Sequence, residues 1–249
     1  MLQLHNVSVR YGAKYILNDV SLALRPHRLT VMVGQNGSGK STLLACVNQQ
    51  IPYTGQIVEG EKNMALISLR ERAKSLAILP QNLPSPHVTA YEMAAFGRNP
   101  YLDFTGRLTE KDKQIVTAAL ADVGASELGA RYVDTLSGGE QQRVRLAMIL
   151  AQNTPIALLD EPTSHMDQRS EATFLELLRD LKCRKKKTFL VVIHDLTLAA
   201  EYADDLIVLE EGRVVFSGTK EDCLEREIIE KTFGLKRYTV EGKVFFSAN

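Results

Sequence analysis

The chain reads Gly34-Gln35-Asn36-Gly37-Ser38-Gly39-Lys40-Ser41-Thr42 directly after a run of apolar and β-branched residues, 29–33. The glycines let the backbone curl so that several amides point at one phosphate group. Lys40 would neutralise phosphate charge, and the Ser41 hydroxyl would hold Mg²⁺. The preceding run predicts a strand and the following residues, 40–45, predict a helix. Strand, glycine loop and helix together predict a nucleotide-binding phosphate loop.

A second anion-binding signal lies far downstream, in Leu136-Ser137-Gly138-Gly139-Glu140-Gln141-Gln142-Arg143. A serine and two glycines before an amphipathic run predict a helix start whose amides face outward. One ATP molecule does not need two such sites in one chain. We therefore expect the second site to contact a nucleotide held by another copy, which predicts a homodimer that closes around ATP.

Composition excludes several classes of protein. The 249 residues carry 30 Lys plus Arg and 30 Asp plus Glu, so nothing in the charge favours a nucleic-acid partner. The three cysteines, Cys46, Cys183 and Cys223, form no close pair, which argues against a disulfide framework or zinc site. Neither a signal peptide nor an apolar run of about 20 residues is evident, so we expect a cytosolic protein.

The apolar patterning predicts an α/β fold. Residues 2–10 and 20–24 alternate as half-buried strands do, whereas 156–160 and 188–193 are continuous apolar runs typical of buried parallel strands. The amphipathic stretches that precede these runs, 138–152 and 168–182, predict helices. Alternating helices and strands are typical of a doubly wound parallel sheet.

One domain with subdomains is expected. Helical periodicity dominates 84–152, so we predict a helical insertion there, with core segments 1–83 and 153–225 and a tail at 226–249. The tail should form a hairpin around Glu241-Gly242. The basic run at 182–187 is interpreted as a solvated loop.

Two acidic residues, Asp160 and Glu161, end the predicted strand 156–159, where ligands of α/β sheets bind. Asp160 can hold Mg²⁺ and Glu161 can act as general base toward the attacking water. His194 ends another buried strand and could orient that water, while His5, His27 and His87 are interpreted as structural. Gln81 could sense metal and water, and Tyr11 could stack on adenine.

With these motifs the chain resembles the nucleotide-binding subunits of ATP-binding cassette (ABC) transporters almost from end to end. The resemblance assigns the A-loop to Tyr11, the Walker A loop to 34–42, the Q-loop to Gln81 and the signature to 136–140. It further assigns Walker B to 156–160, the catalytic glutamate to Glu161, the D-loop to Ser164-His165-Met166-Asp167 and the switch histidine to His194.

The resemblance implies a P-loop NTPase (RecA-like) core with an N-terminal antiparallel β subdomain and an α-helical signature subdomain. It implies Mg-ATP hydrolysis in which Lys40, Gln81, Glu161 and His194 act, with Ser41, Gln81 and Asp160 near Mg²⁺. Ser137, Gly138, Gly139, Glu140 and Asp167 would contact ATP in trans. The implied partners are membrane permease subunits, docked near Gln81 and 84–104 on the cytoplasmic face, and indirectly a substrate-binding protein.

Softer signatures at 96–101, 151–155 and 194–199 are similar to those of metal-chelate importers, which take up ferric siderophores, haem or cobalamin. Met166 and Thr197 depart from the usual leucine and asparagine. Two alternatives stay open: an ATPase for another solute or an exporter, and a non-transport ABC switch protein. The second fits poorly, because one phosphate loop and no heptad stretch occur in 249 residues.

Overall fold

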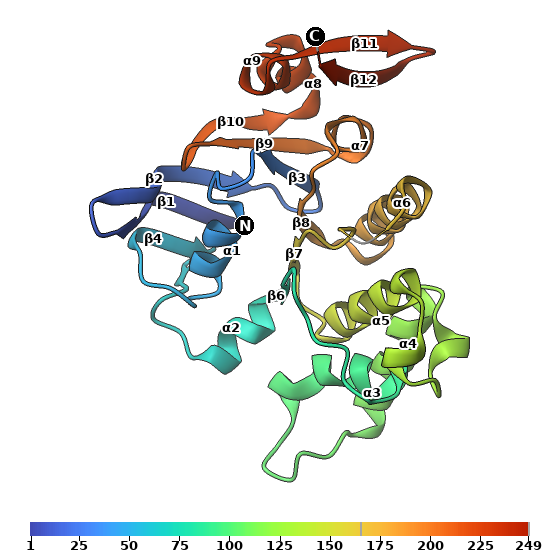
Figure 1. Cartoon of the computed structure of the whole chain (residues 1–249). Helices are drawn as coiled ribbons and strands as arrows, with labels where there is room; N and C mark the ends of the chain where they lie inside the picture. The colour runs from blue at the N-terminus through green and yellow to red at the C-terminus, as the bar shows by residue number, and fades with distance from the viewer. Residues whose placement is uncertain (165, 249) are drawn as a thin grey trace. The chain divides into compact units, whose positions relative to one another are not determined.

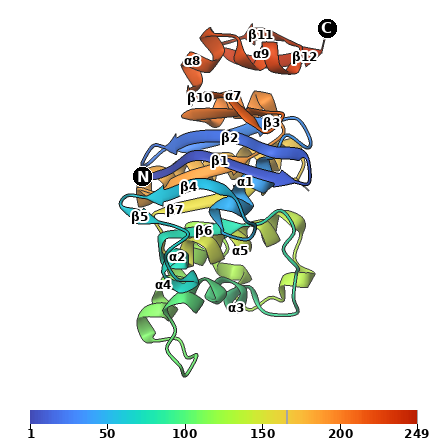
Figure 2. The same cartoon turned by 90° about the vertical axis from the view of Figure 1, so that its left-hand side faces the viewer.

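The computed structural model describes residues 1–164 and 166–248, which form two compact units. One unit contains Met1–Ile67 together with the chain from Thr188 onward, and the other contains Ser68–Lys187. Figure 1 and Figure 2 label the helices and strands of both units.

The first unit begins with an antiparallel sheet of order β2-β1-β4-β5. Its strands are β1 (Leu2–Tyr11), β2 (Lys14–Leu24), β4 (Thr54–Glu59) and β5 (Lys62–Asn63). In both views β1 lies between β2 and β4 (Figure 1, Figure 2). The alternating pattern of 2–10 and 20–24 therefore predicted two strands correctly, and the apolar side chains of β1 point to a buried face.

The same unit holds four strands in the order β10-β9-β3-β8. They are β3 (Leu29–Gly34), β8 (Thr188–Val192), β9 (Asp205–Glu210) and β10 (Arg213–Thr219). Every residue of β3 and β8 is buried, and β3 pairs in parallel with both β8 and β9. Helices α1 (Lys40–Val47) and α7 (Leu196–Tyr202) pack against β3. Continuous apolar strands of this kind need cover on both faces.

The C-terminal part of the first unit contains α8 (Lys220–Glu225), α9 (Ile228–Phe233) and a hairpin of β11 (Leu235–Val240) and β12 (Lys243–Ala248). Glu241 and Gly242 connect the strands with φ values of 50° and 78°. Two consecutive positive φ angles are those of a type I′ turn. The predicted hairpin is confirmed.

The second unit contains a parallel strand pair and most of the helices. The strands are β6 (Leu76–Leu79) and β7 (Ile156–Asp160). The helical elements are α2 (Leu69–Ser75), α3 (Ala90–Ala95), the 3₁₀ turns η1 (Phe96–Tyr101), η2 (Ser126–Leu128) and η3 (Val133–Thr135), and α4 (Glu110–Asp122), α5 (Gly138–Ala151) and α6 (Gln168–Lys185). Both α3 and α4 pack on α5. The elements found within 84–152 are thus helical, as the sequence predicted.

The interpretation of 182–187 as a loop is wrong, although Arg184, Lys185 and Lys186 are exposed to solvent as predicted. Lys182, Arg184 and Lys185 form the last turn of α6, where cations favour the negative end of the helix dipole. Lys186 caps the helix in a left-handed conformation, and Lys187 is only 6% exposed because it leads into the buried β8. Among the described residues, no helix is long and apolar enough to cross a membrane.

Candidate functional site

The phosphate loop lies in the first unit, between the end of β3 and the start of α1. Gly39 precedes α1 with φ 104°, and a Cβ there would lie 2.7 Å from Leu17 Cδ2, so only glycine fits. No side chain within the described residues caps α1 at Gly39. The first amides of the helix, which have no partner within it, therefore face an external acceptor.

Lys40 folds back over this loop. Its Nζ donates to Gly34 O at 2.8 Å and to Gln35 O at 3.1 Å, and the residue is 6% exposed. The Ser38 hydroxyl oxygen is buried and finds no hydrogen-bond partner in the described part of the chain. A buried ammonium, an open helix N-terminus and an unsatisfied hydroxyl are the donors that a phosphate group accepts from. The residues present fit a nucleotide phosphate.

Two further predicted residues belong to the first unit. Tyr11 is the last residue of β1 and is 61% exposed, so its ring is accessible for stacking. His194 follows β8 by two residues and is exposed just before α7. Both positions agree with a strand-end location, while their contacts with a nucleotide stay a prediction.

The second unit brings Gln81 and Glu161 into direct contact. Gln81 Nε2 donates to Glu161 Oε2 at 2.6 Å, and the two residues follow the adjacent strands β6 and β7. Asp160, the last residue of β7, is 7% exposed. Glu161 has φ 47°, a left-handed conformation that costs a non-glycine residue about 1–3 kcal/mol. Such strain is typical of side chains held in one orientation for function.

The signature turn forms the start of α5. Ser137 is the N-cap: its hydroxyl and amide both donate to Glu140 Oε2, at 2.7 Å and 2.8 Å. The hydrogen bond from the Ser137 hydroxyl, the largest cause, lowers the pKa of Glu140. Glu140 therefore contacts its own turn and Arg131, at 3.3 Å, while Ser137 and Gly138 are exposed.

A pocket of about 780 Å³ adjoins this turn. Its lining includes Gly138 and Gly139 at the start of α5, and Asp167 and Ser170 at the start of α6. Asp167 caps α6 by accepting from Ser170 N at 2.9 Å. Arg143 and Arg169 also line this pocket, and their positive charges favour an anion there. The D-loop residue His165 lies outside the described residues.

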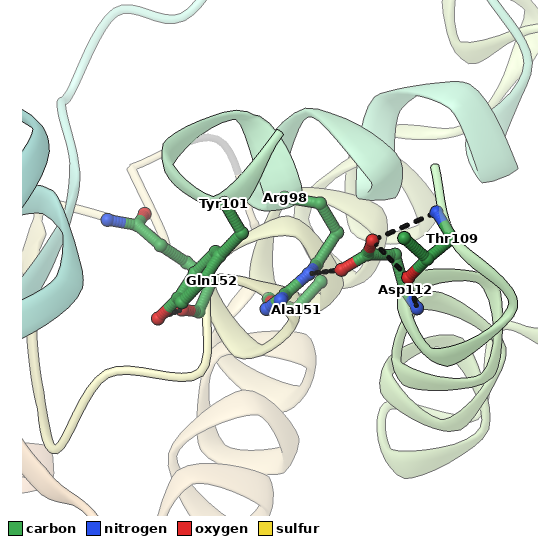
Figure 3. A network of polar contacts seen from close by, with 6 residues as sticks. All are labelled: Arg98, Tyr101, Thr109, Asp112, Ala151 and Gln152. Atoms are coloured by element: carbon green, nitrogen blue, oxygen red, sulfur yellow. Dashed lines mark hydrogen bonds and ion pairs between the residues drawn. The ribbon is translucent and has the colours of Figure 1, made fainter. Parts of the chain in front are cut away.

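Residues 96–101, the importer-like segment, form η1, and their Arg98 and Tyr101 side chains belong to a network of polar contacts (Figure 3). Arg98 is 5% exposed; its Nε donates to Asp112 Oδ1 at 2.8 Å, and its guanidinium lies 3.9 Å from the centre of the Tyr101 ring. Arg98 Nη1 donates to Ala151 O at 2.8 Å, and the Tyr101 hydroxyl donates to Gln152 O at 2.9 Å. The motif therefore fixes η1 to the C-terminal end of α5, and its exposed side chains are those of Phe96, 43% exposed, and Asn99.

Asp112 was missed by sequence reasoning, because nothing in 109–122 distinguishes its carboxylate from other acidic residues of an exposed helix. It is also the capping-box residue of α4: its Oδ2 accepts from Thr109 Oγ1 at 2.6 Å. The hydrogen bond from the Thr109 hydroxyl lowers the pKa of Asp112 most, the Thr109 amide and then Arg98 lower it further, and burial opposes them. Asp112 therefore has two functions: it stabilises the start of α4, and it pairs with the buried Arg98 of 96–101.

No group of three or more His, Cys, Asp or Glu side chains able to hold a metal ion occurs among the described residues. The candidate Mg²⁺ ligands are the Ser41 hydroxyl, the Asp160 carboxylate and the Gln81 amide. In proteins Mg²⁺ is usually held by a small number of protein oxygens, and phosphate and water oxygens fill the rest of its coordination shell. Each of these three oxygens is of a type that fits Mg²⁺.

Comparison with known proteins gives a consistent result. The family model described as ABC transporter matches residues 17–164. An iron(3+)-hydroxamate import ATP-binding protein of Bacillus subtilis (strain 168) is 35% identical over 234 residues, 93% of this chain and 87% of that protein. A hemin import ATP-binding protein of Pseudomonas aeruginosa is 40% identical over 243 residues, 95% of this chain and 93% of that protein.

Solved structures share the fold. A nucleotide-free ATP-binding cassette from an ABC transporter has a TM-score of 0.84 at 23% identity, covering 94% of this chain and 97% of that chain. A dimeric, post-hydrolysis ATP-binding cassette bound to ADP and Pi has a TM-score of 0.74 at 26% identity, covering 88% of this chain and 99% of that chain. The predicted P-loop NTPase fold is confirmed.

Proposed function

Because this chain belongs to the ABC transporter family, we propose that it is the ATP-hydrolysing subunit that energises uptake of a metal chelate, with a ferric siderophore as the favoured cargo. The observation that carries the proposal is the likeness to import ATP-binding proteins over 93% and 95% of the chain. The contact between Gln81 and Glu161 supports it, because hydrolysis needs a general base held in place.

The phosphate-binding residues of the proposal are Gly34, Gln35, Asn36, Gly37, Ser38, Gly39, Lys40, Ser41 and Thr42. Their support is the fit of the loop, helix start and Lys40 to a phosphate group. Tyr11 would stack on the base. Glu161 would take the proton of the attacking water, and His194 would orient that water.

Ser41, Asp160 and Gln81 are the proposed ligands of Mg²⁺. When bound, Mg²⁺ neutralises charge on the β- and γ-phosphate oxygens. The Gln81 amide is neutral, so its Nε2 can donate a hydrogen bond to Glu161 Oε2 without adding a further charge beside the carboxylate.

A homodimer completes the proposal. Ser137, Gly138, Gly139, Glu140 and Asp167 would contact the nucleotide of the partner copy. The pocket beside the starts of α5 and α6 supports this, since Arg143 and Arg169 in its lining attract a phosphate. The dimeric relative bound to ADP and Pi gives a precedent at 26% identity.

The relatives named as import ATP-binding proteins imply membrane permease partners. We place their docking region near Gln81 and in 84–104, where Phe96 is exposed. The chain would then act at the cytoplasmic face of the membrane, with a substrate-binding protein on the other side as an indirect partner.

Hemin is the second candidate cargo. The hemin import relative is 40% identical to this chain, whereas the hydroxamate relative is 35% identical. The residues that select cargo are not expected in this subunit, so the difference in identity leaves the ferric siderophore as the favoured cargo and hemin as the second.

The test is uptake of radiolabelled iron, given as a ferric hydroxamate or as hemin, in cells carrying wild type or Glu161→Gln. Loss of catalysis of at least ~10²-fold is expected on removing a catalytic group of this kind, so uptake of the true cargo should stop. Glu176→Gln, an exposed change on α6, is the control. Uptake of both compounds at the wild-type rate in Glu161→Gln cells would contradict the proposal.

A further inference from the structure

Three side chains of α5 outside the signature turn are joined in one hydrogen-bonded set, here called the α5 polar network: Gln141, Gln142 and Arg145. Arg145 Nη2 donates to Leu83 O at 2.7 Å and to Ser85 Oγ at 3.0 Å, and its Nη1 donates to Gln142 Oε1 at 3.0 Å. All its acceptors lie in the second unit.

The hydrogen bonds continue from Arg145 in two directions. Ser85 Oγ donates to Gln141 Oε1 at 2.7 Å, and Gln141 Nε2 donates to Leu136 O at 3.0 Å, directly before the signature serine. Gln142 Nε2 donates to Pro162 O, directly after Glu161. One arginine is thus linked to the segment that follows Gln81, to the signature turn and to the turn that carries Glu161.

The direction of donation depends on Arg145. A guanidinium has only donors, so the Ser85 hydroxyl and the Gln142 carbonyl must accept from it. Once they do, the Ser85 hydrogen is directed to Gln141 and the Gln142 amide to Pro162. Arg145 is half-buried, and this burial lowers the pKa of its guanidinium. Hydrogen bonds are stronger where water is partly excluded.

We propose that Arg145 is a positioning residue for hydrolysis: through Leu83, Ser85, Gln141 and Gln142 it holds Gln81, the signature turn and Glu161 in one fixed arrangement. The inference rests on the proposed function of these three sites. In this proposal Arg145 acts through its protein contacts alone, so its effect is on the rate of the chemical step and not on nucleotide affinity.

The experiment compares the ATPase activity of wild type, Arg145→Met and Arg145→Lys, with Arg184→Met as a control that removes an exposed arginine of α6 and its ion pairs. Methionine keeps the volume and removes every donor. We expect kcat to fall ~10-fold in Arg145→Met while KM for ATP changes less than about twofold, because displacement of catalytic groups lowers the rate without removing a substrate contact. Arg145→Lys should retain part of the rate.

Hydrogen exchange supplies a readout independent of activity. In Arg145→Met the amides of Leu136 and Ser164, which donate to Val133 O and Glu161 O within the two turns that the network joins, should exchange ~10-fold faster than in wild type, because local opening governs exchange. Unchanged exchange and unchanged kcat in a folded Arg145→Met protein would overturn the inference. An inactive wild type would instead contradict the proposed function, and the exchange result would still test the positioning role.

Discussion

A single buried ionisable residue can make the stability of the fold depend on pH, and Lys187 is the clearest example in this chain. Its Nζ donates to Thr154 O, and burial, with a smaller contribution from Lys185, lowers its pKa to about 8. An unfolded lysine titrates near pH ~10.4. Because the folded pKa lies below the unfolded one, the charged form is disfavoured in the fold. The contribution of Lys187 to the free energy of unfolding is therefore lowest below pH ~8 and rises as the pH increases toward ~10.4.

We expect Lys187→Met to remove this rise. Urea unfolding at pH 7 and pH 9.5 should show wild type gaining about 1–2 kcal/mol relative to the variant at the higher pH, at ~1.4 kcal/mol per pKa unit. Lys186→Met, an exposed neighbour, serves as the charge-matched control. Equal pH dependence in wild type and Lys187→Met would show that Lys187 titrates normally.

The residue scale also shows the limit of sequence reasoning. Lys187 and Arg145 occur in polar sequences that suit a solvated surface, and their burial results from segments distant in the chain. Arg145 bonds to Leu83, 62 positions away. Gln81 and Glu161 were predicted as site residues because each follows an apolar strand, but the roles assigned to them stay predictions.

Among the elements, α4 and η1 depend on the buried pair Arg98–Asp112. Asp112→Ala should destabilise the fold by about 3–5 kcal/mol, since it leaves a buried guanidinium without its carboxylate and also removes the capping box of α4. The double variant Arg98→Met/Asp112→Ala should lose less than the sum of the single changes. A double-mutant cycle in urea measures the difference, and strict additivity would rule out coupling between the two side chains.

Element types were largely predictable from the sequence, because apolar runs and amphipathic periodicity dominate their formation. The strands at 29–34, 156–160 and 188–192 and helix α5 lie where expected. The α6 end was misplaced because five basic residues resemble a loop, although cations also stabilise a last helical turn. The contacts that 96–101 makes with α5 could not be predicted, because they depend on the close approach of η1 to α5. This approach is so close that a Cβ at Gly97 would overlap Met148 O.

For the whole molecule, the homodimer proposal predicts a change of mass with nucleotide. Glu161→Gln should bind Mg-ATP without turning it over and elute as a dimer, while the same protein without ATP should elute at lower mass. Ser137→Arg in that background should prevent the dimer, because a bulky side chain would fill the exposed signature turn. Size-exclusion chromatography with light scattering measures both. A nucleotide-independent mass for Glu161→Gln would contradict closure on ATP.

The family and fold of the whole chain were predictable because two short motifs with fixed spacing require a particular geometry of strand, loop and helix. The class of cargo, a metal chelate, was also predicted, from 96–101, 151–155 and 194–199, and relatives named for iron-hydroxamate and hemin import support it. The particular chelate was not predictable, because the residues that select it are not expected in a motor subunit. The subdomain boundaries at 84–152 and 226–249 likewise stay a prediction.

The hydroxyl of Ser137 is already engaged by Glu140 before any partner arrives. A phosphate oxygen that reaches it must displace that carboxylate, so one hydrogen bond is exchanged for another and the net gain is small, about 1 kcal/mol or less. A contact formed by such an exchange adds little to the affinity between the two copies. When the phosphate leaves, the hydrogen bond between Ser137 and Glu140 forms again. In the proposed homodimer, the capping box therefore favours separation of Ser137 from the partner's nucleotide once that phosphate leaves.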